Sequence, residues 1–350
     1  MDLSEIKKIR EKFLAFYEAS KRVLPWRRNQ DPYAIWVSEI MLQQTQVDTV
    51  MKRYDAFLER FPTVQALAEA EELSVCEAWA GLGYYRRARL LHRGARAVVE
   101  EYQGVIPGDA LTLQTLPGIG RYTAGAIASI AFKQRAPLVD GNVERVLCRI
   151  FLIDDAPKSS AGQKKLWALA EALVQGERPG DLNQSLMELG ALICTPKQPQ
   201  CTVCPLRMHC GALANDRVNE LPVPNPPPKR QILEVAYLWL SASDGRVYLR
   251  QRGLEGLWAG LWEPYSCEGK TAHAELMEQC GCDLVSSGIS VSHQLTHRDV
   301  RATVYVPTKK KNSLARRLAL HAVVDPLAAP LSALARKVVM AQVAAQLAAP

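Results

Sequence analysis

The sequence predicts two domains of different class: a mainly α-helical N-terminal domain and an α+β C-terminal domain. Apolar residues recur at helical spacing through the first two hundred residues, where strand-like alternation is scarce. The proline-rich stretch 221–231 ends this pattern and favours an extended linker, because proline cannot continue a helix. Beyond it, short runs rich in β-branched residues are separated by turn residues. The expected domains are therefore 1–220 and 232–350, joined by that linker.

The helices of the first domain are predicted from apolar residues that repeat every three or four positions. Such segments are 3–19, 35–57, 90–102, 121–131 and 161–174. In the second domain, alternation predicts strands at 232–240, 247–251 and 300–307. The turn residues 243–245 are expected to join the first two strands as a hairpin.

Composition limits the protein class. The 350 residues are 48% hydrophobic and 23% charged, as in soluble globular proteins. The 43 basic residues exceed the 36 acidic ones, giving a net charge of +7 that leans toward a polyanionic partner and is equally compatible with chance. The N-terminus lacks the apolar core of a signal peptide, and no stretch is apolar enough to span a bilayer. We therefore expect a reducing compartment, where the nine cysteines favour metal ligation over disulfides.

Four cysteines lie close together in the sequence. Cys194, Cys201, Cys204 and Cys210 follow the spacing C-x6-C-x2-C-x5-C. Four thiolates so close can surround one metal centre, and thiolate ligation suits zinc or an iron–sulfur cluster; the spacing alone does not separate the two. The other five fit no ligand spacing and are predicted to be core or surface residues. These are Cys76, Cys148, Cys267, Cys280 and Cys282.

A glycine-containing turn lies between two helical segments. The run 116–120 reads Leu-Pro-Gly-Ile-Gly, and Gly118 and Gly120 permit a tight turn without Cβ clashes. Such a turn directs backbone N–H groups outward at a helix N-terminus, where a DNA phosphate can bind. Taken alone, the same short pattern is better explained as an ordinary helix–helix turn with a glycine C-cap. Asp140, twenty residues further on, has the ordinary interpretation of a helix N-cap.

Two further stretches are ambiguous by pattern. Glu39 follows Trp36 at what looks like the start of a helix, so it is expected in the first turn, where a surface acid is unremarkable. The run 81–89 combines tyrosines and arginines. It indicates either a solvated basic helix start or an aromatic wedge inserted between DNA bases, flanked by phosphate contacts.

Together these stretches resemble the MutY-type adenine DNA glycosylases of the helix–hairpin–helix superfamily. The matching strings are 38–46, 81–89, 116–127, the cysteine cluster and the run 183–191 that precedes it. The resemblance covers nearly the whole chain; it is strongest from Leu24 to Cys210 and weaker from Ile232 onward. It implies a helical glycosylase with an iron–sulfur loop, followed by an α+β Nudix-like domain.

The resemblance assigns chemical roles to four residues. Glu39 is the expected general acid, with apolar neighbours that raise its pKa. Asp140 is expected to stabilise the oxocarbenium-like sugar. Tyr122 stands where bifunctional relatives carry a lysine nucleophile, and a phenol cannot form an imine. Tyr122 and Asn142 are expected to support the sugar and the attacking water.

The resemblance also implies DNA contacts. Tyr84 is expected to intercalate beside the oxidised guanine, with Arg87 contacting phosphate nearby. Leu42 and Gln44 match residues that enter the duplex. The hairpin glycines are expected to bind a phosphate without sequence preference.

The second domain resembles the Nudix-like domain of the same family through the run 250–262. A Nudix hydrolase needs a glutamate-dense helix that binds magnesium, and the run 274–279 is too sparse, so base recognition is expected instead of hydrolysis. Leu295, Thr296 and His297 stand where the family has Phe-Ser-His. Thr296 and His297 are the expected contacts to the oxidised base, with ordinary loop polarity as the competing interpretation.

The resemblance thus implies a monofunctional glycosylase that releases adenine mispaired with 8-oxoguanine or guanine in duplex DNA. It implies one 4Fe–4S cluster on the four clustered cysteines, no membrane partner, a monomer, and a cytoplasmic, bacterial nucleoid-associated location. Two alternatives remain. An endonuclease III-like pyrimidine glycosylase is disfavoured by Tyr122 and the second domain, and a non-catalytic iron–sulfur DNA-binding protein by the presence of both Glu39 and Asp140.

Overall fold

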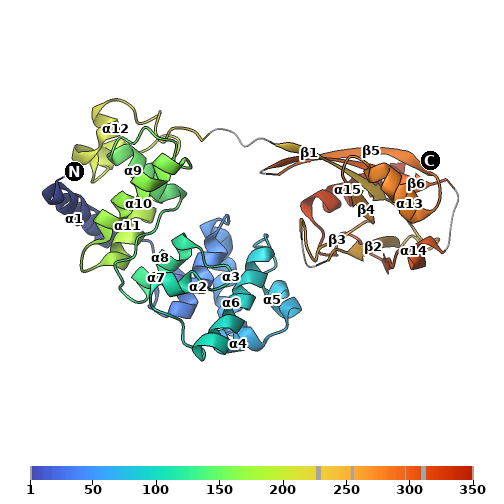
Figure 1. The fold of residues 1–350 in the computed structure, drawn as a ribbon, viewed down its shortest axis with the longest axis horizontal. Helices are drawn as coiled ribbons and strands as arrows, with labels where there is room; N and C mark the ends of the chain where they lie inside the picture. Colours follow the sequence, from blue (N-terminus) through green and yellow to red (C-terminus); the bar gives the residue numbers. More distant parts are fainter. Residues whose placement is uncertain (1, 226–229, 254–255, 296, 309–312, 349–350) are drawn as a thin grey trace. The chain divides into compact units, whose positions relative to one another are not determined.

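The chain folds into two compact units, Met1–Pro226 and Pro227–Pro350 (Figure 1). The computed structural model describes residues 2–225, 230–253, 256–295, 297–308 and 313–348. The division between the units falls inside the stretch that the sequence predicts as a linker. Across these described residues, we find no helix with the length and hydropathy needed to cross a bilayer.

The first unit is helical, as predicted from the spacing of its apolar residues. Helices begin at or within a residue of 3, 121 and 161, as expected, and the predicted helix 90–102 starts four residues earlier. The helices are α1 (Leu3–Ser20), η1 (Pro25–Arg27), α2 (Pro32–Leu42), α3 (Val47–Arg60), α4 (Val64–Glu69), α5 (Glu72–Ala78), α6 (Arg86–Tyr102), α7 (Ala110–Leu113), α8 (Arg121–Ile130), α9 (Gly141–Ile150), α10 (Ser160–Val174), α11 (Pro179–Leu192), η2 (Cys201–Val203), η3 (Arg207–His209) and α12 (Gly211–Ala214).

One predicted helix is two. The segment 35–57 was expected to be continuous, but α2 ends at Leu42 and α3 begins at Val47. Gln44, between them, has φ of 56°, which a continuing helix cannot accommodate. The expected helix start was also wrong: Asp31 caps the backbone N–H of Tyr33 and Pro32 begins the helix. Glu39 therefore lies well past the first turn, on a helix that is buried nearly all round.

The helical unit contains two hydrophobic cores, which define two lobes. The first core is built from η1, α2–α7 and part of α8, and the second from α1 and α8–α11. Helix α8 contributes Ile127 to the first core and Ala126 to the second. A Cβ on Gly125 would lie 2.0 Å from the carbonyl oxygen of Pro137, so glycine allows the chain leading to Asp140 to lie directly against α8.

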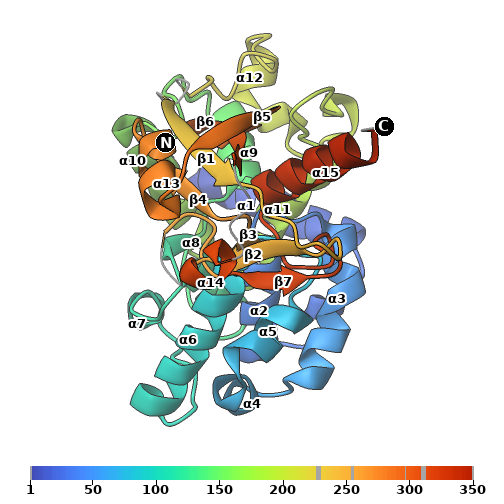
Figure 2. The same ribbon diagram turned by 90° about the vertical axis from the view of Figure 1, so that its right-hand side faces the viewer.

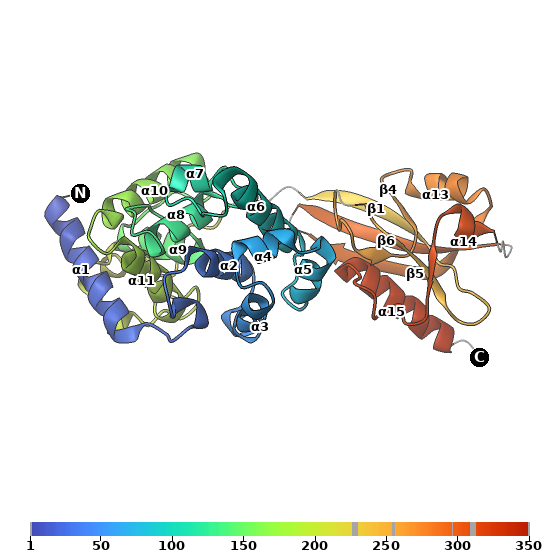
Figure 3. The ribbon, with the colours of Figure 1, turned by 90° about the horizontal axis from the view of Figure 1, so that it is seen from below.

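The second unit combines two sheets with helices, as predicted. A four-stranded sheet has the order β4-β1-β6-β5, with β1 parallel to β6, and a three-stranded sheet has the order β3-β2-β7. Helix α15 packs on β5 (Figure 3). The elements are β1 (Gln231–Leu238), β2 (Val247–Gln251), β3 (Trp262–Glu263), β4 (Ser266–Glu268), α13 (Ala272–Cys280), β5 (Leu284–Gln294), β6 (Arg298–Pro307), α14 (Leu314–Arg317), β7 (His321–Val323) and α15 (Ala333–Ala348).

The expected turn 243–245 joins the first two strand segments of this unit, and a short antiparallel contact flanks it: the backbone N–H of Tyr248 donates to Leu240, and that of Ala242 donates to Arg246. The turn forms, with the backbone N–H of Gly245 donating to Ala242. However, β1 and β2 belong to different sheets, joined near the turn by the bridge between Ser241 and Val247. Strand β2 pairs instead with β3 and β7, and Figure 2 shows β2 beside β7.

Candidate active site

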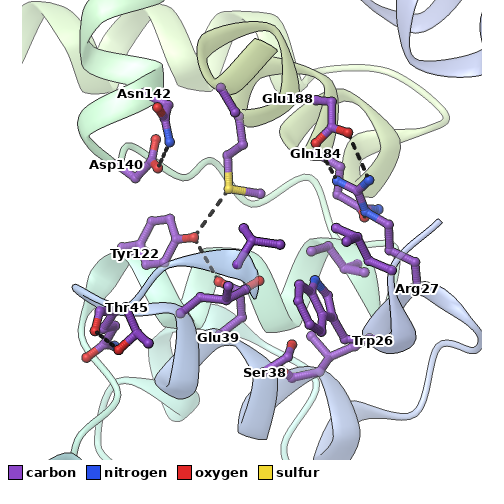
Figure 4. A pocket seen from close by; sticks show the side chains of 18 of the residues that line it. Trp26, Arg27, Ser38, Glu39, Thr45, Tyr122, Asp140, Asn142, Gln184 and Glu188 are labelled. Atoms are coloured by element: carbon purple, nitrogen blue, oxygen red, sulfur yellow. Dashed lines mark hydrogen bonds and ion pairs between the residues drawn. The ribbon is translucent and has the colours of Figure 1, made fainter. Parts of the chain in front are cut away.

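A cavity of about 550 Å³ opens between the two lobes of the helical unit. This volume is in the range of pockets that enclose a small organic ligand. Helix α2 forms one wall and the N-terminus of α9 with α11 forms the other, so residues far apart in the sequence meet here (Figure 4). The lining includes Trp26, Arg27, Ser38, Glu39, Leu42, Gln44, Tyr122, Asp140, Asn142, Gln184, Met187 and Glu188.

Glu39 points into this cavity from α2 and is only 5% exposed. The pKa of its carboxyl is raised to about 7, mainly by burial and also by the nearby charge of Asp140; the Tyr122 hydrogen bond and Arg27 oppose this rise. The ordinary value is 4.5, so Glu39 still holds its proton in a large fraction of molecules near neutral pH. The interpretation of Glu39 as a surface acid, which pattern alone favours, is therefore wrong, whereas the raised pKa that the resemblance implies is confirmed.

Tyr122 lies in the first turn of α8, directly after the glycine hairpin. Its hydroxyl donates to Oε2 of Glu39 at 2.8 Å and also lies 3.3 Å from the sulfur of Met187 (Figure 4). Burial and the neighbouring carboxylates raise the pKa of Tyr122 well above its ordinary range. The phenol therefore stays neutral and holds Glu39 in a fixed rotamer.

Asp140 is the N-cap of α9. Its Oδ1 accepts from the backbone N–H of Val143 at 2.7 Å, and its Oδ2 accepts from the side-chain amide of Asn142 at 3.0 Å. Arg145 in turn donates to Oδ1 of Asn142 at 2.8 Å. Burial raises the pKa of Asp140, and the hydrogen bonds from Val143 and Asn142 oppose that rise. Asp140 therefore both caps α9 and lines the cavity, and the capping hydrogen bond holds its carboxylate in place there.

The cavity is also lined by a second polar group, which the sequence did not predict. Glu188 on α11 accepts hydrogen bonds from Arg22 at 2.9 Å and from Arg27 at 3.0 Å. Although burial raises the pKa of Glu188, these bonds outweigh it and lower the pKa to about 2. Gln184 accepts from Nε of Arg27 at 3.1 Å. The spacing of apolar residues on α11 gave no signal for this buried acid, because Glu188 lies on the helix face of Gln184 and Ser185.

The hairpin glycines differ in conformation. Gly118 has φ of 82°, and an added Cβ would lie 2.8 Å from the Cβ of Leu90, so this position requires glycine. Gly120 is the exposed N-cap of α8, and no side chain caps this end of the helix. Among the described residues, no side chain therefore occupies the N-terminus of α8, and its contact with a DNA phosphate stays a prediction.

The three residues expected to enter the duplex lie at the end of α2, in the turn after it and in the loop before α6. Leu42 is half-buried at the end of α2, whereas Gln44 is exposed in the turn after it. Tyr84 precedes α6, is 65% exposed and has φ of 49°. Gln44 and Tyr84 therefore both adopt the left-handed conformation that side chains disfavour.

Arg87 is not where the phosphate-contact hypothesis requires it. Its side chain is buried in the first turn of α6, 8% exposed, and both terminal nitrogens donate to groups within the protein. A guanidinium so committed cannot also bind a phosphate on the surface. The expectation of a phosphate contact at Arg87 is therefore corrected.

The four clustered cysteines line one small cavity of about 20 Å³ beside α9 and α11. Nη1 of Arg149 lies 3.3 Å from the sulfur of Cys194, and Arg207 lines the same cavity. The described part of the chain contains no group of His, Cys, Asp or Glu arranged to hold a single metal ion. Of the other cysteines, Cys148 and Cys280 are buried.

In the second unit, His297 is exposed in the turn between β5 and β6, and its carbonyl oxygen accepts from the backbone N–H of Gln231. Leu295 packs partly against the core of this unit. Thr296 lies outside the described residues. A buried ion pair network joins Arg250 and Arg252 to Glu263 and stabilises the β2–β3 ladder.

Comparison with known proteins identifies both units. Residues 37–172 match the model of the HhH-GPD superfamily of base excision DNA repair proteins, and residues 236–341 match the NUDIX domain. A thermostable thymine-DNA glycosylase of known structure superposes with a TM-score of 0.56 at 32% identity, over 61% of this chain and 98% of that one. The helical fold with its cavity therefore defines a base excision DNA repair protein of the helix–hairpin–helix class.

The sequence relatives narrow this class. An adenine DNA glycosylase of Buchnera aphidicola subsp. Baizongia pistaciae is 34% identical over 71% of this chain and 70% of its own length. The chain belongs to the adenine DNA glycosylase family. The human adenine DNA glycosylase is 52% identical over 60% of this chain, which corresponds to 40% of the human protein. The chain thus spans less than half the length of its human, rat and mouse relatives.

Proposed function

We propose that this chain hydrolyses the N-glycosidic bond of adenine mispaired with 8-oxoguanine or guanine in duplex DNA, acting as a monomer. The observation that carries the proposal is the pair of carboxyl groups in one cavity. Glu39 holds its proton in a large fraction of molecules near neutral pH because it is buried, while Asp140 is fixed by two residues of α9, Asn142 and Val143. Two carboxyl groups with different environments supply an acid and a cation stabiliser in one site.

The chain's residues account for each step of base release. An adenine turned out of the duplex enters the cavity, and Glu39 gives its proton to a ring nitrogen. The glycosidic bond then breaks, its electron pair leaves with adenine, and the Asp140 carboxylate stabilises the positive sugar carbon. Water adds to that carbon and returns a proton to Glu39. Tyr122 keeps Glu39 in place, and Asn142 keeps Asp140 in place.

The opposite wall of the cavity supports a purine substrate. Trp26 offers an aromatic surface on which a base can stack, and Gln184 offers a side-chain amide in the same cavity (Figure 4). Glu188 is buried, and both of its carboxylate oxygens accept hydrogen bonds from Arg22 and Arg27. It therefore holds Arg27 in the cavity wall, and Arg27 in turn donates to Gln184.

The test is single-turnover base release from duplexes that carry adenine or thymine opposite 8-oxoguanine, and a thymine glycol opposite adenine. The proposal requires adenine release from the first duplex. Release of the damaged pyrimidine alone would support the endonuclease III-like alternative, and no release from any duplex would support a non-catalytic DNA-binding protein.

The chain is expected not to cleave the DNA strand through a Schiff base. Tyr122 occupies the position of the lysine nucleophile, and a phenol cannot form an imine with the sugar. Borohydride trapping on an adenine:8-oxoguanine duplex should yield little or no covalent adduct. Efficient trapping that is lost when a residue of the hairpin is replaced would overturn the monofunctional assignment.

We further propose that Cys194, Cys201, Cys204 and Cys210 hold one 4Fe–4S cluster. The four thiols share one cavity, which fits thiolate-only ligation. A single tetrahedral zinc ion would instead need the sulfur atoms within about 4 Å of one another, given zinc–sulfur bonds of about 2.3 Å. Arg149 and Arg207 beside the cavity offset the negative charge of the thiolates. When bound, the cluster would cross-link the loop at four points.

Removing this group has a measurable consequence. Protein purified anaerobically should be brown, with iron and sulfide in near-equal amounts of about four per chain. Replacing Cys201 with serine should lower both contents and the melting temperature of the helical unit. One equivalent of zinc without iron in the wild-type protein would contradict the cluster assignment.

The second unit is the proposed reader of the base opposite adenine. Adenine is a normal base, so its safe removal requires recognition of the oxidised partner. The helical unit contains the catalytic cavity, and the second unit matches a NUDIX domain, a fold that binds nucleotides. His297 is exposed in the β5–β6 turn, where it is free to contact a base.

Alanine at both Thr296 and His297 is expected to reduce the preference for 8-oxoguanine over guanine by about fivefold, since a lost hydrogen bond is worth about 1 kcal/mol. Truncation after Arg230 should reduce this preference further while sparing some adenine excision. The measurement is the ratio of single-turnover rates on the two duplexes. An unchanged ratio in the truncated protein would show that the lesion is read elsewhere.

A further inference from the structure

Arg87 connects two loops that are distant in the sequence. Its Nη1 donates to the carbonyl oxygens of Ile40 at 2.8 Å and Met41 at 2.9 Å, and also to that of Gln43. Its Nη2 donates to the carbonyl oxygens of Leu82 at 3.0 Å and Gly83 at 3.1 Å. One buried guanidinium thus ties the C-terminal end of α2 to the loop before α6.

Two of these carbonyl groups have a special position. The carbonyls of Gln43 and Gly83 belong to the peptide groups that immediately precede Gln44 and Tyr84. Gln44 and Tyr84 have φ of 56° and 49°, a conformation that costs free energy for any residue with a Cβ and persists only where its surroundings enforce it. Arg87 fixes the orientation of both preceding peptide planes.

Further contacts of Arg87 extend this arrangement to side chains. Its guanidinium carbon lies 5.6 Å from the ring centroid of Tyr84 and 5.5 Å from that of the buried Trp79. Nη2 also donates to Oγ1 of Thr45 at 2.9 Å. The backbone before Tyr84 is therefore held in place by buried contacts, although the ring of Tyr84 is exposed to solvent.

We propose that Arg87 is the positioning residue that holds Gln44 and Tyr84 in their strained conformations and in fixed register with the helix that carries Glu39. This inference rests on the proposed glycosylase function, because it assumes that both residues enter the duplex. Arg87 contacts neither DNA nor the reacting atoms. It holds Gln44 and Tyr84 in the conformation needed to enter the duplex before DNA binds, so that DNA binding does not have to order these two loops.

Lysine at position 87 tests this role. It keeps the positive charge and much of the length, but a single ammonium group has three donors and no planar fork, so it cannot hold five carbonyl groups. The matched control is Arg86→Lys, because Arg86 is the exposed neighbour on the same turn. The substrate is a duplex with adenine opposite 8-oxoguanine and 2-aminopurine next to the 8-oxoguanine, so that fluorescence reports local unstacking.

Arg87→Lys is expected to slow both the fluorescence rise and single-turnover adenine release at least tenfold. The active fraction, taken from the burst amplitude, and the pH dependence of release should stay as in the wild type, because the surroundings of Glu39 are unchanged. Arg86→Lys should stay within twofold of wild type. A structural role alone would instead reduce the active fraction and leave the rate of the surviving enzyme unchanged.

The inference is overturned if Arg87→Lys releases adenine within twofold of the wild-type rate per active molecule, or if Arg86→Lys loses as much. If Arg87→Lys does not fold, Thr45→Val is the second test. It removes one acceptor of Arg87, together with the long hydrogen bonds that Thr45 itself donates to Gln43 and Leu82, and leaves the guanidinium in place. A loss of at least twofold in unstacking rate supports the role, and an unchanged rate contradicts it. Failure of the wild type to release adenine would overturn the proposed function instead.

Discussion

Replacing Glu39 with glutamine is expected to slow single-turnover adenine release by about 10²- to 10⁴-fold, the usual range for loss of a general acid. Glutamine has nearly the same shape and can still accept the hydrogen bond that Tyr122 now gives to the carboxylate. It has no acidic proton to transfer to adenine. Binding to the mispaired duplex, measured by fluorescence anisotropy, should persist because Glu39 makes no phosphate contact in its buried position.

The matched control is Glu144→Gln, the same change at another buried carboxylate. Glu144 lies on α9, is paired with Lys158 and does not line the cavity. Its replacement should leave the rate per active molecule within about twofold of wild type. If Glu39→Gln released adenine within a few-fold of the wild-type rate, Glu39 would not be the general acid.

The pH dependence of the wild type follows from the same residue. Glu39 must be protonated to act, and burial places its pKa at about 7. The rate of release should therefore fall about tenfold per pH unit above about 7. At acidic pH the rate should fall again, because Asp140 becomes protonated and can no longer stabilise a cation. Burial raises the pKa of Asp140, so this acidic decrease should occur at a higher pH than for an ordinary aspartate.

Replacing Asp140 with asparagine is expected to slow adenine release at least about a hundredfold, because the positive sugar loses its stabilising charge. Asparagine is as good an N-cap as aspartate, so α9 should keep its start and the fold its stability. The charge of Asp140 raises the pKa of Glu39 in the wild type. Without that charge the pKa of Glu39 should be lower. The residual rate of release should therefore begin to fall with rising pH at a lower pH than in the wild type.

Asp109→Asn is the control for capping. Asp109 is the N-cap of α7 and accepts from the backbone N–H of Thr112 at 2.8 Å, as Asp140 does from Val143. It lies outside the cavity, so its replacement should leave adenine release unchanged. If Asp140→Asn and Asp109→Asn had equally small effects on the rate, Asp140 would be a cap and nothing more.

The sequence was informative wherever local pattern decides the structure. Helical spacing placed α1, α8 and α10 to within a residue at their starts, and the prolines marked the division between the two units. It failed where distant contacts override local pattern. The break between α2 and α3 follows no proline or glycine. The carbonyl of Gln43 at this break accepts from Arg87, forty-four positions later in the chain, and no periodicity reveals that contact.

The candidate site shows the same limit. The expected residues Glu39, Tyr122, Asp140 and Asn142 do meet in one cavity, but they were chosen by resemblance, since pattern alone favoured a surface acid and a cap. Arg27 and Glu188 were not anticipated, because their pairing joins η1 to α11 across the junction of the lobes. A junction between two cores is a property of packing and has no local sequence signal.

The buried position of Glu39 also has a consequence for folding equilibrium. Its pKa is about 7 in the folded protein against an ordinary 4.5. Below the ordinary value both the folded and unfolded chains hold the proton, so Glu39 does not affect their balance. Above pH 7 the native state must keep a carboxylate that the unfolded chain exposes to water, which destabilises the native state by about 3 kcal/mol. Judged by thermodynamic stability alone, a carboxyl group at this position is therefore unfavourable above pH 7.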